Sequence, residues 1–128
     1  MAKILLIDDD EALTTVFATA LKEAGFEMVT ATNGEDGLNK AKTEKPDLIL
    51  LDQVLPDING NDVLKSLKEN PETQVIPVAI LSNFGQNELV QTALNQGALD
   101  YILKYQIEPE DLINKVKGML KETQVKAV

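Results

Sequence analysis

The sequence predicts an α/β fold in which helices cover both faces of a five-stranded parallel sheet, a three-layer sandwich. Five short apolar or weakly alternating runs, each too short for a helix, are typical of strands. A stretch with apolar residues at helical spacing follows each run, so strand and helix alternate five times, as right-handed crossovers require. The expected strands are Lys3–Ile7, Phe26–Ala31, Leu48–Leu51, Val75–Leu81 and Leu99–Leu103.

Local signals set the ends of the predicted helices. The first begins in an acidic turn, which suits the positive end of a helix dipole, and Gly25 ends it. Asn33 is a predicted cap for the second helix. Asn70-Pro71 ends the third, Gly97 ends the fourth, and Pro109 fits the first turn of the fifth. The expected helices cover residues 13–24, 33–43, 62–69, 86–95 and 109–121.

Length and composition indicate one folded domain. The chain has 128 residues, of which 44% are apolar and 26% charged, enough to build a sizeable core. We expect residues 1–122 to form this domain and residues 123–128 to form a C-terminal tail. The sequence contains no internal repeat and no low-complexity linker.

The missing residue types limit the chemistry. Cysteine and histidine are both absent, so there is no disulfide, no thiol nucleophile and no imidazole base or ligand. Any metal site must therefore consist of oxygen atoms, which favours a hard cation such as Mg²⁺.

Charge and hydropathy limit the partners. The net charge of −9 argues against direct binding to nucleic acid, whose phosphates need a basic face. No apolar run is long enough to span a membrane, and no signal-peptide pattern opens the sequence. We expect a cytoplasmic protein.

Polar side chains follow four of the predicted strands. They are Asp8 and Asp9, Asp52, Ser82 and Lys104. The carboxyl ends of parallel strands form a crevice in such folds, so neighbouring strands would bring these groups together. Crowded carboxylates repel unless a cation such as Mg²⁺ lies between them. A metal, a lysine and a hydroxyl around one carboxylate would suit phosphoryl transfer to that carboxylate.

Four segments of the sequence carry a family resemblance: ILLIDDDEAL, LLDQVLPDINGNDVL, AILS and GALDYILK. They contain an acidic pair, an acceptor carboxylate, a hydroxyl, an aromatic residue and a lysine, at Asp8, Asp9, Asp52, Ser82, Tyr101 and Lys104. From about Lys3 to Leu120, the chain resembles the CheY-like receiver domain of two-component response regulators, of the stand-alone single-domain type. The resemblance implies the flavodoxin-like receiver fold, with strand order 2-1-3-4-5.

The resemblance also implies a mechanism. Asp52 would take a phosphoryl group from a histidine kinase or phosphotransfer protein. Mg²⁺ would be held by Asp9, Asp52 and the backbone carbonyl of Val54, with Asp8 reaching it directly or through water. Lys104 and Ser82 would hold the phosphoryl oxygens.

The family further implies a switch. Ser82 would turn toward the phosphoryl group and Tyr101 would move into the vacated space. The face formed by the fourth helix, fifth strand and fifth helix would then change shape and contact a downstream effector protein. Such a chain would be a monomer or a phosphorylation-dependent dimer. It would not be an enzyme, and its only chemistry would be its own phosphorylation and dephosphorylation.

Three positions depart from the family pattern. Tyr105 follows Lys104 where the family usually has a proline, commonly in a cis peptide, so this loop is either trans and rearranged or strained. Asn83 replaces a small residue beside Ser82. Val54 and Phe84 are apolar at positions that influence the hydrolytic water, which predicts a long-lived phosphoryl group.

Other functions compete with this one. A phosphorylation-independent interaction module could keep the same fold. An aspartyl-phosphate hydrolase of the haloacid-dehalogenase type could use Asp8 and Asp10 as its D-x-D, which would leave Asp52 unexplained. A flavodoxin-like nucleotide binder would need a first turn rich in Gly, Ser and Thr, and this turn is three aspartates.

Overall fold

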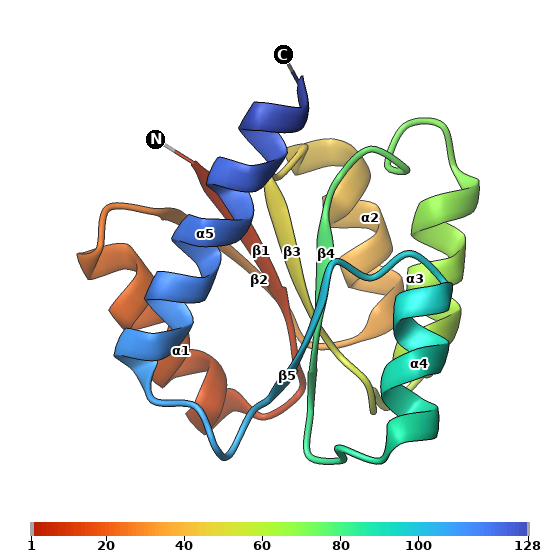
Figure 1. Cartoon of the computed structure of the whole chain (residues 1–128), viewed down its shortest axis with the longest axis horizontal. Helices are drawn as coiled ribbons and strands as arrows, with labels where there is room; N and C mark the ends of the chain where they lie inside the picture. The colour runs from red at the N-terminus through yellow and green to blue at the C-terminus, as the bar shows by residue number, and fades with distance from the viewer. Residues whose placement is uncertain (1, 128) are drawn as a thin grey trace.

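The computed structural model describes residues 2–127, and the side chains of residues up to 122. Five parallel strands form one sheet in the order β2-β1-β3-β4-β5, which confirms the order implied by the resemblance (Figure 1). The strands are β1 Lys3–Ile7, β2 Glu27–Ala31, β3 Leu48–Asp52, β4 Val78–Ser82 and β5 Asp100–Leu103.

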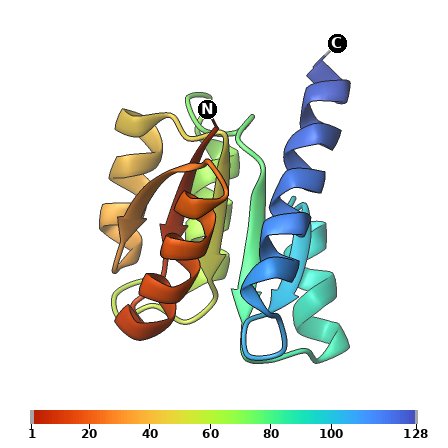
Figure 2. The ribbon, with the colours of Figure 1, turned by 90° about the vertical axis from the view of Figure 1, so that its left-hand side faces the viewer.

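Five helices cover the two faces of this sheet. They are α1 Glu11–Glu23, α2 Gly34–Glu44, α3 Gly60–Glu69, α4 Asn87–Asn95 and α5 Pro109–Ala127. Helices α1 and α5 lie on one face, and α2, α3 and α4 on the other (Figures 1 and 2). The result is the predicted three-layer sandwich. No helix in the described part of the chain is long and apolar enough to cross a membrane.

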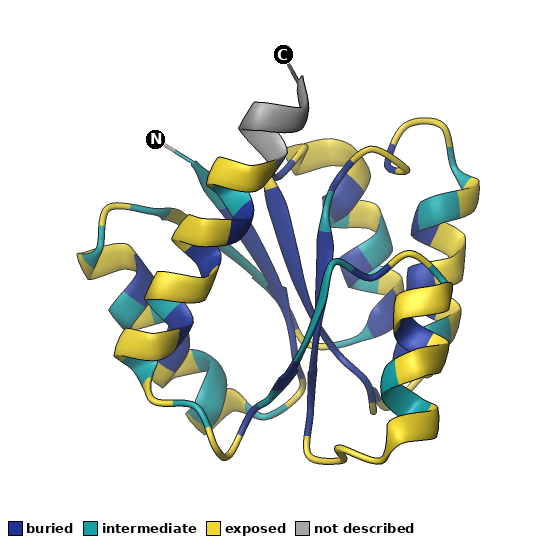
Figure 3. Ribbon diagram, viewed as in Figure 1, coloured by how far each residue is buried: buried dark blue, intermediate teal, exposed yellow. Residues whose placement is uncertain are grey.

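The side chains of the central strands divide between two cores. Strands β3 and β4 are buried throughout, as expected for strands covered on both faces (Figure 3). Leu48 and Leu50 pack with side chains of α1 and α5, whereas Ile49 and Leu51 pack with α2, α3 and α4. This alternation follows from the two-residue period of a strand. It also determines on which side of the sheet each residue at a strand end lies.

The predicted helix signals are present in the structure. The side chain of Asn33 accepts a hydrogen bond from the backbone N–H of Asp36 at 2.8 Å, which caps α2. Asp10 caps α1 in the same way through the N–H of Leu13. Gly25 and Gly97 follow α1 and α4 with φ of 101° each, a conformation that favours glycine.

Some element boundaries differ from the prediction. Strand β4 begins at Val78, not Val75, because Pro77 has no N–H to donate to a ladder and Val75 lies in an exposed turn. Helix α5 continues past Lys121 to Ala127, since this segment contains no glycine or proline that would end it. The backbone of most of the predicted tail thus belongs to α5, and Val128 lies outside the described residues.

The start of α3 lies directly against the end of β3. The N–H of Gly60 donates to the carbonyl of Gln53 at 2.7 Å. A Cβ atom at Gly60 would lie 2.5 Å from the carbonyl oxygen of Asp52 and 2.7 Å from the Cα of Gln53. A glycine is therefore required where the loop returns to the strand end.

We predict that Gly60→Ala lowers the free energy of unfolding by about 1–3 kcal/mol, because the new methyl group displaces the backbone at Asp52. Gly118→Ala is the matched control, since a Cβ there meets nothing within 4 Å. That change in a helix should stabilise the protein by up to about 1 kcal/mol. Equal stabilities of the two variants in urea denaturation would contradict the packing argument.

Candidate functional site

The carboxyl ends of β1, β3, β4 and β5 bring the predicted polar residues to one edge of the sheet. Asp9, Asp52, Ser82 and Lys104 line one cavity of about 190 Å³ there. Asp8 is buried beside it and forms an ion pair with Lys104. The predicted convergence of these side chains is therefore present in the structure.

Three carboxylates in this cavity region form a possible metal site. Asp8, Asp9 and Asp52 each offer an oxygen atom within 4.8 Å of the other two. Asp8 and Asp52 are buried and Asp9 is exposed, so a cation could approach from the side of Asp9. An all-oxygen set of this kind suits Mg²⁺ better than a transition metal. Val54 lines the same cavity, and its carbonyl remains a predicted ligand.

Lys104 is the cation of the cluster, and its side chain is only 4% exposed. Its Nζ lies 3.0 Å from Asp8 Oδ2 and 3.2 Å from Asp52 Oδ1. Burial alone would lower the pKa of Lys104, but the hydrogen bond with Asp8 and the charges of Asp52 and Asp8 outweigh it and raise the pKa. The lysine thus stays protonated at neutral pH.

One ammonium does not neutralise three carboxylates. The pKa of Asp52 is raised from 3.8 to about 6, first by burial and next by the negative charge of Asp8, although Lys104 opposes the shift. Asp52 is therefore mostly ionised at neutral pH, at an energetic cost. A divalent cation would relieve this cost, so the donor atoms and the surplus negative charge both fit Mg²⁺.

Ser82 and Tyr101 meet at a residue that the sequence analysis missed. Ser82 Oγ donates to Gln53 Oε1 at 2.8 Å, and Tyr101 Oη donates to the same oxygen at 2.8 Å. Tyr101 Oη also lies 2.6 Å from the carbonyl oxygen of Phe84. Strand alternation could have pointed to Gln53. This residue continues the face of Leu51, and the register of β3 and β4 places it beside Ser82 on the same face.

The loop after Lys104 is not strained by a cis peptide, because all peptide bonds between described residues are trans. The trans alternative of the prediction is therefore the correct one. Tyr105 Oη donates to Asp10 Oδ2 at 3.0 Å, which joins the loop after β5 to the loop after β1 at the mouth of the cavity. The N–H of Leu13, and next Tyr105, lower the pKa of Asp10.

Comparisons with known proteins agree with this fold. Residues 4–117 match the family described as the response regulator receiver domain. PilH of Pseudomonas aeruginosa is 34% identical over 120 residues, which cover 94% of this chain and 98% of PilH. The transcriptional regulator PhoP of Bacillus subtilis is 35% identical over 98% of this chain, which spans about half, 51%, of PhoP.

A solved structure shows the same architecture. The CheY-like response regulator receiver domain protein of Methanospirillum hungatei superimposes with a TM-score of 0.91 at 29% identity, over 98% of both chains. The fold and the site thus define a two-component signalling module. The chain belongs to the response regulator receiver domain family, which argues against the hydrolase and nucleotide-binder alternatives.

The raised pKa of Asp52 predicts a pH-dependent stability difference. The folded chain holds the Asp52 proton more tightly than the unfolded chain, so the contribution of Asp52 to the free energy of unfolding falls as the pH rises from 3.8 to about 6. Without Mg²⁺, Asp52→Asn should therefore melt higher than the wild type by a few degrees at about pH 7.5, with no difference near pH 4.

Thermal unfolding followed by circular dichroism measures this difference. Added Mg²⁺ should raise the melting temperature of the wild type and narrow the gap, because the variant lacks one anionic ligand. An Asp52→Asn variant that melts lower than the wild type at neutral pH would contradict this explanation of the raised pKa. So would a difference in melting temperature that stays the same at every pH.

Proposed function

We propose that the chain accepts a phosphoryl group on Asp52 from the phosphohistidine of a histidine kinase or phosphotransfer protein, and signals through a downstream effector protein. One observation carries the proposal. Asp52, only 4% exposed, lies beside a buried lysine and two further carboxylates that together could hold Mg²⁺. This arrangement suits phosphoryl transfer, in which positioning and charge neutralisation supply most of the catalysis.

Each residue of the cluster has a role in the proposed reaction. An oxygen of ionised Asp52 attacks the phosphorus in line, the P–N bond breaks, and its electron pair returns to the imidazole of the partner. Asp9, Asp52 and the Val54 carbonyl would hold Mg²⁺, with Asp8 reaching it directly or through water, and the ion would supply charge neutralisation. Lys104 Nζ, 3.2 Å from Asp52, is close enough to pair with a phosphoryl oxygen.

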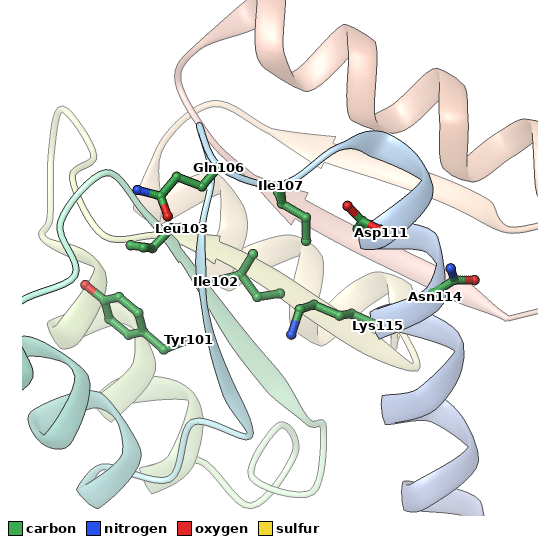
Figure 4. A pocket seen from close by; sticks show the side chains of 8 residues that line it. All are labelled: Tyr101, Ile102, Leu103, Gln106, Ile107, Asp111, Asn114 and Lys115. Carbon is green, nitrogen blue, oxygen red and sulfur yellow. The ribbon is translucent and has the colours of Figure 1, made fainter.

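The proposed output surface is the face of α4, β5 and α5. A groove of about 550 Å³ lies between β5 and α5 on this face (Figure 4). It is lined by Tyr101, Ile102, Leu103, Gln106, Ile107, Asp111, Asn114 and Lys115. Tyr101 thus lines this groove and also hydrogen-bonds toward the site, through Gln53. A change at the site could therefore alter the surface that an effector contacts.

The acceptor acts once per phosphoryl group and is then reset, so we expect no enzymatic turnover of a separate substrate. The net charge of −9 disfavours direct contact with nucleic acid. We also propose a cytoplasmic location without membrane contact, as a monomer or a phosphorylation-dependent dimer.

Intact mass measured after incubation with Mg²⁺ and acetyl phosphate tests the function. The wild type should gain one phosphoryl group and Asp52→Asn none. Asp47→Asn, the same chemical change at the opposite end of β3, should behave as the wild type. A folded wild type that binds Mg²⁺ but gains no mass would reject the proposal and favour a phosphorylation-independent interaction module.

Two apolar side chains at the cavity predict a slow loss of the phosphoryl group. Val54 is 60% exposed and Phe84 is 46% exposed, and neither can orient a water molecule for attack. Val54→Asn should shorten the lifetime of the phosphoprotein by about tenfold, less than the roughly hundredfold of a true general base, because an amide can orient water but cannot take its proton. Val75→Asn, at an exposed position in a remote turn, is the control.

The decay is followed by intact mass after removal of the phosphodonor. A wild-type phosphoryl group that disappears within seconds would contradict the prediction. So would equal lifetimes of the wild type and Val54→Asn.

A further inference from the structure

Gln53 has a buried side-chain amide that contacts both predicted switch residues. It follows Asp52 in the chain and is 7% exposed. Its Oε1 accepts hydrogen bonds from Ser82 Oγ and Tyr101 Oη, each at 2.8 Å. Ser82 Oγ accepts in turn from the N–H of Phe84 at 3.0 Å. The amide is therefore the only side chain among those with described contacts that hydrogen-bonds to both Ser82 and Tyr101.

Two hydroxyl protons are shared among three hydrogen bonds in this network. Each hydroxyl has one proton to donate. The proton of Ser82 serves Gln53 Oε1. The proton of Tyr101 faces two acceptors, Oε1 and the carbonyl of Phe84, which lies nearer at 2.6 Å. The Tyr101 hydroxyl can form a full hydrogen bond with only one of these two acceptors. The choice of acceptor therefore depends on whether Ser82 also donates to Gln53 Oε1.

A phosphoryl group on Asp52 would change this balance. Its oxygens are charged and attract the proton of Ser82 more strongly than a neutral amide does. Once Ser82 donates to the phosphoryl group, Gln53 Oε1 loses one donor in a buried place, where an unpaired acceptor is costly. The proton of Tyr101 then turns toward Oε1, and the Phe84 carbonyl in the exposed loop after β4 is released.

We propose that Gln53 is a positioning residue that transmits phosphorylation from Ser82 to Tyr101 by this exchange of hydrogen-bond donors. The inference rests on the proposed function and adds the residue through which the site reaches the output face. Strand alternation places Gln53 on the same side of the sheet as both hydroxyls. Asp52 continues the side of β3 that faces α1 and α5, whereas Gln53, Ser82 and Tyr101 continue the opposite side.

The chain offers a direct probe, because Tyr101 and Tyr105 are its only tyrosines. Protein labelled with 3-fluorotyrosine should give two ¹⁹F resonances, which Tyr105→Phe assigns. Gln53→Met keeps the length and apolar bulk of the side chain and removes both hydrogen bonds. In the resting protein this variant should move the Tyr101 resonance and leave the Tyr105 resonance in place.

Phosphorylation then tests the transmission. With acetyl phosphate and Mg²⁺, the Tyr101 resonance of the wild type should shift. In Gln53→Met this shift should fall about threefold or more, while the rate of phosphoryl uptake by intact mass stays within about twofold. Gln53→Glu restores an acceptor oxygen and should recover most of the shift. Gln53→Leu repeats the loss with a second apolar side chain.

Two results would overturn the proposal: a phosphorylated Gln53→Met with a Tyr101 shift of wild-type size, or a folded Gln53→Met that no longer takes up the phosphoryl group. The second would place Gln53 in the acceptor chemistry itself. Failure of the proposed function is separate and visible in the wild type, as absence of any adduct. In that case the transmission fails with it, and the resting spectra show only a structural contact.

Discussion

The structure depends on one buried ion cluster, in which the ammonium group of Lys104 lies between Asp8 and Asp52. Each of these groups would be costly to bury alone, and removal of Lys104 would leave both carboxylates without a counter-charge. The cluster therefore requires that β1, β3 and β5 end at the same edge of the sheet. The observed strand order and register meet this requirement. The excess of carboxylates over ammonium groups then favours the binding of a divalent cation, which phosphoryl transfer to Asp52 would need.

The acceptor cluster and the two switch hydroxyls continue opposite sides of the sheet. Asp8, Asp52 and Lys104 extend the strand faces that pack against α1 and α5. Ser82 and Tyr101 extend the faces that pack against α2, α3 and α4. The two groups meet at the strand ends, where Ser82 lines the same cavity as Asp52. Gln53 lies there and bonds to both hydroxyls.

Much of this could be predicted from sequence, because short apolar runs and helical spacing are local properties. The strand ends carrying Asp52, Ser82 and Lys104 followed from them directly. The strand order did not, since it depends on which crossovers form and entered only through family resemblance. Gln53 and the Tyr105–Asp10 hydrogen bond were missed, because these contacts join residues distant in sequence. The start of β4 was misplaced because Val75 fits an apolar run, but Pro77 prevents the ladder from extending to it.

Reductive trapping of the phosphorylated protein tests the central assignment most directly. Borohydride reduces an aspartyl phosphate to homoserine, and peptide mass spectrometry then identifies the residue that carried the phosphoryl group. We expect homoserine at position 52 and unmodified aspartate at positions 8 and 9. Homoserine at position 8, with Asp52 unchanged, would contradict it, because Asp8 is assigned here to the ion pair with Lys104 and to the cation.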